Sequence, residues 1–72
     1  MIEKEVVSSQ IKKVGYDKEK KELFITFNNG KKYKYSNVPM DLYLSLMAAD
    51  SIGSYFIKNI KGKTSYPFVL IS

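Results

Sequence analysis

The sequence contains no cysteine, no histidine and no tryptophan, and each of its twelve basic residues is a lysine. Without cysteine no disulfide can form, and without cysteine or histidine no zinc site of the usual kind is expected. The same absences remove the commonest general base and the thiolate nucleophile. Lysine lacks the bidentate fork with which arginine reads guanine, so sequence-specific DNA recognition is disfavoured.

Long apolar runs are also missing, because no segment approaches the ~20 residues that cross a membrane. The polar start at residues 1–5 is unlike a secretory signal. We therefore expect a cytoplasmic protein without membrane contact.

The 72 residues, 44% of them hydrophobic, predict one small globular domain at residues 1–72. A chain this short buries only ~60% of its surface on folding. With no disulfide or zinc to stabilise it, such a domain depends on tight packing or on self-association. The formal net charge of +5 attracts anions of many kinds.

Hydrophobic periodicity and turn residues predict the secondary structure. The predicted elements are frayed residues 1–5, a strand at 6–14, a charged turn at 15–21, strands at 23–27 and 32–35, a helix from Pro39 to about Ala49, a helix from Asp50 or Ser51 to Gly62, and a short strand within the apolar tail 65–72. This order predicts an α+β fold, with a small antiparallel sheet of three to four strands and a central hairpin packed against two short helices.

The hairpin is the clearest local signal. Asn29-Gly30 supplies the positive φ angles of a two-residue type I′ turn. That turn would set Lys32 opposite the apolar Phe27. One extra loop residue, as a bulge, puts Tyr33 opposite Phe27 instead, so a bulged hairpin is predicted.

Several short motifs occur together along residues 6–61, and the most specific is Ala49-Asp50-Ser51-Ile52-Gly53-Ser54-Tyr55-Phe56. The others are Val7-Ser8-Ser9 with Ile11, Gly15-Tyr16-Asp17, Leu23 with Phe27, Gly30-Lys31-Lys32-Tyr33-Lys34-Tyr35, Val38-Pro39, Tyr43 with Leu46, and Asn59-Ile60-Lys61. The whole pattern resembles the KTSC domain, a small domain that occurs at the C-terminus of some lysyl-tRNA synthetases and as a free-standing bacterial or phage protein. Lys61 departs from the arginine that this family often has there, and the apolar tail 65–72 is an addition to the core at 6–61.

The resemblance implies a fold more strongly than a function. The synthetase context implies proximity to RNA or nucleotides. Related-looking small phage proteins act as sponges that sequester nucleotide immune signals. The resemblance therefore suggests a homo-oligomeric phage sponge for a cyclic dinucleotide, in a bacterial or phage-infected host cell.

The start of the second predicted helix is the first candidate binding site. A helix N-terminus presents unpaired N–H groups and a partial positive charge. Ser51, with the side-chain-free Gly53, would let a phosphate approach the backbone there. The structural alternative is an ordinary serine cap, with Gly53 required by close helix packing.

The second candidate is the alternation Tyr33-Lys34-Tyr35, together with Lys31 and Lys32. Tyrosines on a sheet can stack bases, and lysines can neutralise phosphates. Tyr16, Tyr55 and Lys61 complete the predicted ligand-binding set. The structural alternative, favoured for one of the two tyrosines, makes them half-buried core residues and the lysines a solvated edge that prevents aggregation.

No catalytic residue is predicted, because Ser8 and Ser9 have no histidine partner and no phosphate-binding glycine-rich loop is present. We expect a non-enzymatic module, without cofactor or metal, that binds a nucleotide-type anion as a homo-oligomer. An RNA- or tRNA-associated domain and a protein-interaction domain are the alternatives. The tail 65–72 either pairs with its own sheet or adds a strand to a neighbouring protomer.

Overall fold

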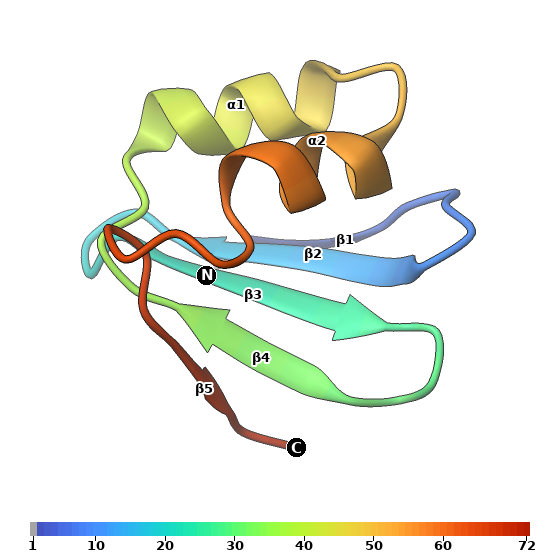
Figure 1. The fold of residues 1–72 in the computed structure, drawn as a ribbon, viewed down its shortest axis with the longest axis horizontal. Coiled ribbons are helices and arrows are strands. Elements are labelled where there is room, and N and C mark those ends of the chain that lie inside the picture. Colours follow the sequence, from blue (N-terminus) through green and yellow to red (C-terminus); the bar gives the residue numbers. More distant parts are fainter. Residues whose placement is uncertain (1) are drawn as a thin grey trace.

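Five strands and two helices form two layers (Figure 1) in the computed structural model, which describes residues 2–72. The elements are β1 (Ile2–Glu5), β2 (Ile11–Asp17), β3 (Glu22–Phe27), β4 (Lys32–Tyr35), α1 (Met40–Ala48), α2 (Ile52–Asn59) and β5 (Phe68–Leu70). All strands join one antiparallel sheet in the order β1-β2-β3-β4-β5, and both helices cover the same face of it. The predicted α+β class is confirmed, with one strand more than the predicted three to four.

The core fills the space between the helices and the covered face of the sheet. Its fully buried side chains are Ile11, Val14, Leu23, Ile25, Val38, Leu46, Phe56 and Ile60. A β-bulge between Ile11 and Lys13 lets Ile11 and Val14 face the same layer although three positions separate them. The opposite face of the sheet carries no helix within residues 2–72.

The start of the chain differs from the prediction of frayed residues 1–5, of which Met1 lies outside the described residues. Residues 2–5 form β1, which pairs with β2 from Ile2–Tyr16 to Glu5–Lys13. Backbone pairing needs no apolar side chains, so hydrophobic periodicity does not predict a strand in this polar segment. Glu3 on β1 also forms an ion pair of 3.2 Å with Lys32 on β4.

The predicted strand at 6–14 is shifted along the chain, because β2 runs from Ile11 to Asp17. The Ser8 hydroxyl accepts hydrogen bonds from the backbone N–H groups of Gln10 (3.2 Å) and Ile11 (3.3 Å), which makes a turn before β2. The predicted turn at 15–21 shrinks correspondingly. Asp17 closes that turn by accepting hydrogen bonds from the backbone N–H groups of Glu19 and Lys20.

The hairpin between β3 and β4 has the predicted faces but another register. Tyr33 lies opposite Ile25 rather than Phe27. The loop spans three residues, because the N–H of Gly30 donates to the Phe27 carbonyl and the N–H of Phe27 donates to the Lys31 carbonyl, both at 2.9 Å. Gly30 takes a φ of 92°, which fits a glycine bulge after the turn. The register therefore moves by two residues and keeps the tyrosines on the helix side.

The helices and the tail agree with the predicted elements. α1 begins after Pro39, and α2 is capped by Ser51, whose hydroxyl accepts a hydrogen bond from the Ser54 N–H at 3.3 Å. The chain leaves α2 through Gly62, at a φ of 77°. The tail forms β5, which pairs with β4 of its own sheet. No helix within residues 2–72 combines the length and apolar character that a membrane span requires.

Candidate functional site

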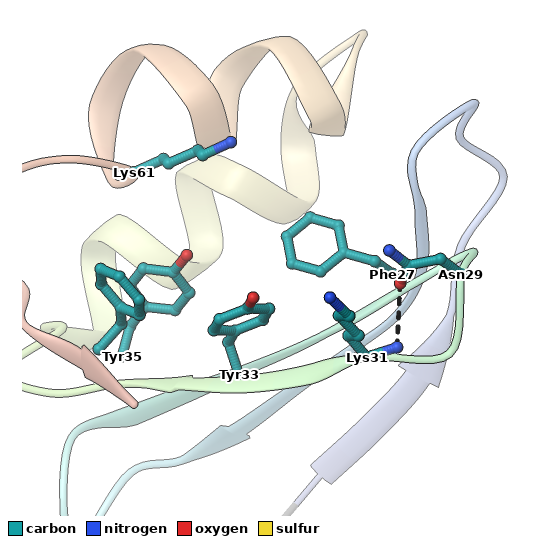
Figure 2. A pocket seen from close by; sticks show the side chains of 7 residues that line it. Phe27, Asn29, Lys31, Tyr33, Tyr35 and Lys61 are labelled. Atoms are coloured by element: carbon teal, nitrogen blue, oxygen red, sulfur yellow. Dashed lines mark hydrogen bonds between the residues drawn. The ribbon is translucent and has the colours of Figure 1, made fainter. Parts of the chain in front are cut away.

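A pocket of about 290 Å³ opens between the β3–β4 hairpin and the segment that follows α2 (Figure 2). Its lining residues are Phe27, Asn29, Lys31, Tyr33, Tyr35, Lys61 and Phe68. Figure 2 shows the hydroxyls of Tyr33 and Tyr35 pointing from β4 towards the space below Lys61. We call this cavity the hairpin pocket. Three predicted ligand-binding residues, Tyr33, Tyr35 and Lys61, meet in it.

Aromatic rings form one wall of the hairpin pocket. The ring of Tyr33 lies between those of Phe27 and Phe68, at a centroid distance of 5.7 Å from each. Tyr35 packs edge-on against Phe56 at 5.2 Å and tilted against Phe68 at 5.7 Å. These contacts hold the rings in place against one another. A base or another flat ring entering the pocket therefore meets an ordered apolar wall.

The charge of the hairpin pocket is positive. It is lined by Lys31 and Lys61 and, within the described part of the chain, by no carboxylate. The two ion pairs within residues 2–72 engage other lysines, with Lys34 lying 3.3 Å from Glu22 and Lys32 bound to Glu3. Lys31 and Lys61 are both exposed. They remain available to an anion.

Hydrogen-bonding groups sit beside the rings. The Tyr35 hydroxyl is protonated at neutral pH and can donate a hydrogen bond. Burial, and next the neighbouring Tyr33, raises the pKa of Tyr35 above the ordinary tyrosine value, so the proton is retained further into alkaline solution. The backbone N–H of Lys31 donates to Asn29 Oδ1 at 3.0 Å, which orients that amide at the mouth. The pocket thus combines a donor hydroxyl, an amide and two ammonium groups with apolar rings.

A second hollow, of about 350 Å³, adjoins the hairpin pocket and shares Phe27, Asn29 and Lys61 with it. Its own lining adds Gln10, Asn28 and Ile57. Because three residues line both, the two hollows adjoin at Phe27, Asn29 and Lys61, and we call them together the groove. One end of the groove is aromatic, and the other is rich in amides.

The structure places the predicted pair Ser51 and Gly53 outside the hairpin pocket, at the opposite end of α2. The hydroxyl of Ser51 is engaged as the helix cap. A Cβ on Gly53 would lie 3.2 Å from Ser8 Oγ and 3.6 Å from Gln10 Oε1, so the connection between β1 and β2 passes close to this glycine and a larger residue would have to displace the Ser8 side chain. The eight residues of α2 span ~12 Å, and this length separates the start of the helix from the end near Lys61.

Tyr16 and Tyr55 also lie outside the hairpin pocket. The Tyr16 hydroxyl donates a buried hydrogen bond of 2.6 Å to the Val38 carbonyl, and its ring stacks on Tyr43 at 4.6 Å. The half-buried Tyr55 packs against the core from α2. Both have packing roles in this fold. The predicted set therefore divides into three residues in one pocket and four elsewhere.

Three residues of the hairpin pocket were not predicted: Phe27, Asn29 and Phe68. Lys31 belongs to the tyrosine–lysine candidate but not to the predicted ligand-binding set. Strand alternation could have found Phe27, because it shares a face with Tyr33. Phe68 could not be found in this way, since its place depends on pairing with Tyr35 from more than thirty residues away in the chain. No group of three carboxylates within residues 2–72 gathers as a metal site.

Comparison with known proteins identifies the family. The model of the KTSC domain matches residues 7–66, so the chain belongs to the KTSC domain family. The crystal structure of a KTSC domain protein from Yersinia pestis superposes with a TM-score of 0.90 at 35% sequence identity, covering 99% of this chain and 97% of that one. An uncharacterized protein from Stutzerimonas stutzeri is 39% identical over 49 residues, which are 68% of this chain and 69% of that protein. The resemblance deduced from the sequence is confirmed.

Proposed function

We propose that the protein is a non-enzymatic binding module that captures a nucleotide-type anion in the hairpin pocket. The observation that carries this proposal is the pairing of an ordered aromatic wall with Lys31 and Lys61, in a cavity without a carboxylate. A base stacks on the rings, and the two ammonium groups balance phosphate. Binding needs no chemistry, in keeping with a sequence that has neither histidine nor cysteine.

The size of the groove favours a ligand with two parts. Ligand sites usually enclose 300–1,000 Å³, and the hairpin pocket alone, at about 290 Å³, suits one nucleotide unit. The adjoining hollow offers Gln10, Asn28 and Asn29, whose side-chain amides can pair with base edges. A dinucleotide with its phosphate beside Lys61 would use both ends. A cyclic dinucleotide immune signal, sequestered as by a sponge in the cytoplasm of an infected cell, is the form we favour.

A thermal-shift panel tests the proposal with cyclic dinucleotides, linear dinucleotides, mononucleotides and short RNA as probes. A ligand at about one hundred times its Kd stabilises the folded state by ~2.7 kcal/mol, which raises the Tm of so small a domain by several degrees. We expect one small nucleotide to give this shift. We also expect weak salt dependence, because few phosphates are neutralised.

Variants locate the site. Lys61→Ala removes one ammonium, and Tyr33→Leu removes a stacking ring worth ~1–3 kcal/mol, so each should weaken binding at least about fivefold. Lys20→Ala is the matched control, because Lys20 is an exposed lysine outside both hollows. A shift that Lys20→Ala and Lys61→Ala reduce equally would contradict the hairpin pocket.

The panel also separates the alternative functions. Binding of RNA alone, lost at moderate salt, would indicate an RNA-associated domain, since counterion release dominates polynucleotide binding. A panel without any shift would contradict nucleotide capture and leave protein interaction as the better account.

A further inference from the structure

The free edge of β5 is the most apolar part of the surface. Phe68, Val69, Leu70 and Ile71 follow one another there and are between 46% and 56% exposed. No charged side chain occurs from Thr64 to Ser72. The other edge of the sheet, β1, carries charge on three of its four residues, Glu3, Lys4 and Glu5. Proteins usually protect exposed edges with such charges, and β5 lacks this protection.

The backbone of β5 is ready to pair on its outer side. The Ile71 N–H donates to the Lys32 carbonyl, and the Pro67 carbonyl accepts from the Ser36 N–H, both at 2.9 Å. Positions 67, 69 and 71 therefore use their backbone groups towards β4. Because these groups alternate along a strand, those of Phe68 and Leu70 point outwards. No element of residues 2–72 lies beyond β5 in the sheet order.

We propose that a second copy of this chain pairs antiparallel with the outer edge of β5. A two-fold axis beside Val69 sets Phe68 of one copy opposite Leu70 of the other. These two residues then exchange their outward N–H and C=O groups, and their side chains pack across the seam on the helix side. The two sheets become one continuous sheet, and neither copy retains an exposed β5 edge.

Charge and symmetry favour a second copy as the occupant. Each chain carries a formal net charge of +5, so two copies repel through most of their surfaces. The β5 edge brings no like charges together, and its apolar side chains are complementary to themselves under a two-fold axis. Pro67 does not obstruct this pairing, because its missing N–H would point towards β4 and not outwards.

The pairing also relates the binding sites of the two copies. An axis perpendicular to the sheet keeps the helices of both copies on the same face. Three strand spacings of ~4.8 Å separate the two β4 strands. Phe68, which lines the hairpin pocket, lies at the seam. The two hairpin pockets therefore open on one side of the dimer, on either side of the seam.

Sedimentation of the ligand-free protein over a wide range of concentrations tests the dimer without reference to nucleotide binding. We expect a reversible monomer–dimer equilibrium. Leu70→Lys puts a charge into the seam and should weaken the dimer at least tenfold. Val7→Lys is the matched control, because Val7 is fully exposed in the connection between β1 and β2 and the substitution adds the same charge. It should dimerise as the unaltered chain does.

A second variant isolates strand pairing from apolar contact. Leu70→Pro removes an outward N–H and leaves the hydrogen bonds between β4 and β5 in place, so it should fold and remain monomeric. Hydrogen exchange adds an independent measurement, since the amides of Phe68 and Leu70 should gain protection as concentration rises. A monomer at every concentration, or a Leu70→Pro chain that folds and dimerises normally, would overturn the proposal.

Discussion

At the residue scale, Tyr16 shows how a polar side chain can belong to a core. Its ring is 4% exposed and stacks on Tyr43, while its hydroxyl donates to the Val38 carbonyl. That carbonyl belongs to the connection between β4 and α1. One hydrogen bond thus ties β2 to the start of the helical layer and satisfies a backbone group that packing has removed from water.

We expect Tyr16→Phe to lower the free energy of unfolding by ~1–2 kcal/mol at neutral pH, because the Val38 carbonyl loses its donor while the ring remains. Burial, and then the carboxylates of Asp41 and Asp17, raises the pKa of Tyr16. A raised folded pKa means that the Tyr16 contribution is complete below the ordinary value of about 10 and is lost as pH rises through the folded pKa.

Urea unfolding of both chains at neutral pH and above about pH 10 measures this effect. The difference between their free energies of unfolding should be smaller at the higher pH, because only the unaltered chain loses the stabilisation contributed by Tyr16. Tyr66→Phe is the control, since the Tyr66 hydroxyl makes no side-chain hydrogen bond within residues 2–72. A difference in the free energy of unfolding that grows with pH would contradict the raised pKa of Tyr16 in the folded chain.

At the element scale, the two ends of α2 differ, because one end is capped within the fold and the other leads to Lys61 in the hairpin pocket. Ser51 caps its start, and Gly53 lets the β1–β2 connection pass close by. Lys61, just beyond its other end, lines the hairpin pocket. The sequence pattern around Ser51 is suited both to a cap and to a phosphate site, and only the position of the aromatic wall distinguishes the two uses.

We expect Ser51→Ala to lower the free energy of unfolding by ~1 kcal/mol, the usual effect of losing a helix cap. Ser51→Asp should retain most of the stability, because a carboxylate also accepts from the first turn and suits the helix dipole. Nucleotide affinity, measured by calorimetry, should stay unchanged in both variants. A loss of affinity in Ser51→Ala without a loss of stability would return the binding site to the start of α2.

At the scale of the whole molecule, one core supports both layers. Phe56 from α2 is fully buried and contacts the rings of Phe27 and Tyr35 from the sheet. Stability of ~0.05–0.15 kcal/mol per residue gives this chain only ~4–11 kcal/mol in total. A single large cavity therefore removes a large part of what holds the fold together.

We expect Phe56→Ala to cost ~3–5 kcal/mol, a large part of that total, and to lower the Tm by at least about 12 °C. Circular dichroism during heating measures the loss. Leu44→Ala on α1 is the matched control, because Leu44 is 55% exposed and its truncation should change stability by less than ~1 kcal/mol. Equal losses of stability in the two variants would contradict the assignment of Phe56 to the core and of Leu44 to the surface.

The local features of this protein are predictable from the amino-acid sequence alone. The hairpin around Gly30, the serine cap of α2 and the glycine exit at Gly62 follow from interactions among residues close in the chain. The KTSC family and the α+β class were also deducible. The hairpin register was not, because the same tyrosine face is compatible with shifts of two residues, and the loop geometry chooses between them.

Which residues line one pocket depends on tertiary packing and does not follow from the local sequence. Lys31, Lys61 and Phe68 come from the hairpin loop, from the turn after α2 and from an edge strand, and they meet because β5 pairs with β4 while α2 packs over the sheet. The polar β1 likewise became a strand through backbone pairing with β2. Such contacts depend on burial of the whole core. The hydrophobic periodicity of single elements therefore does not predict them.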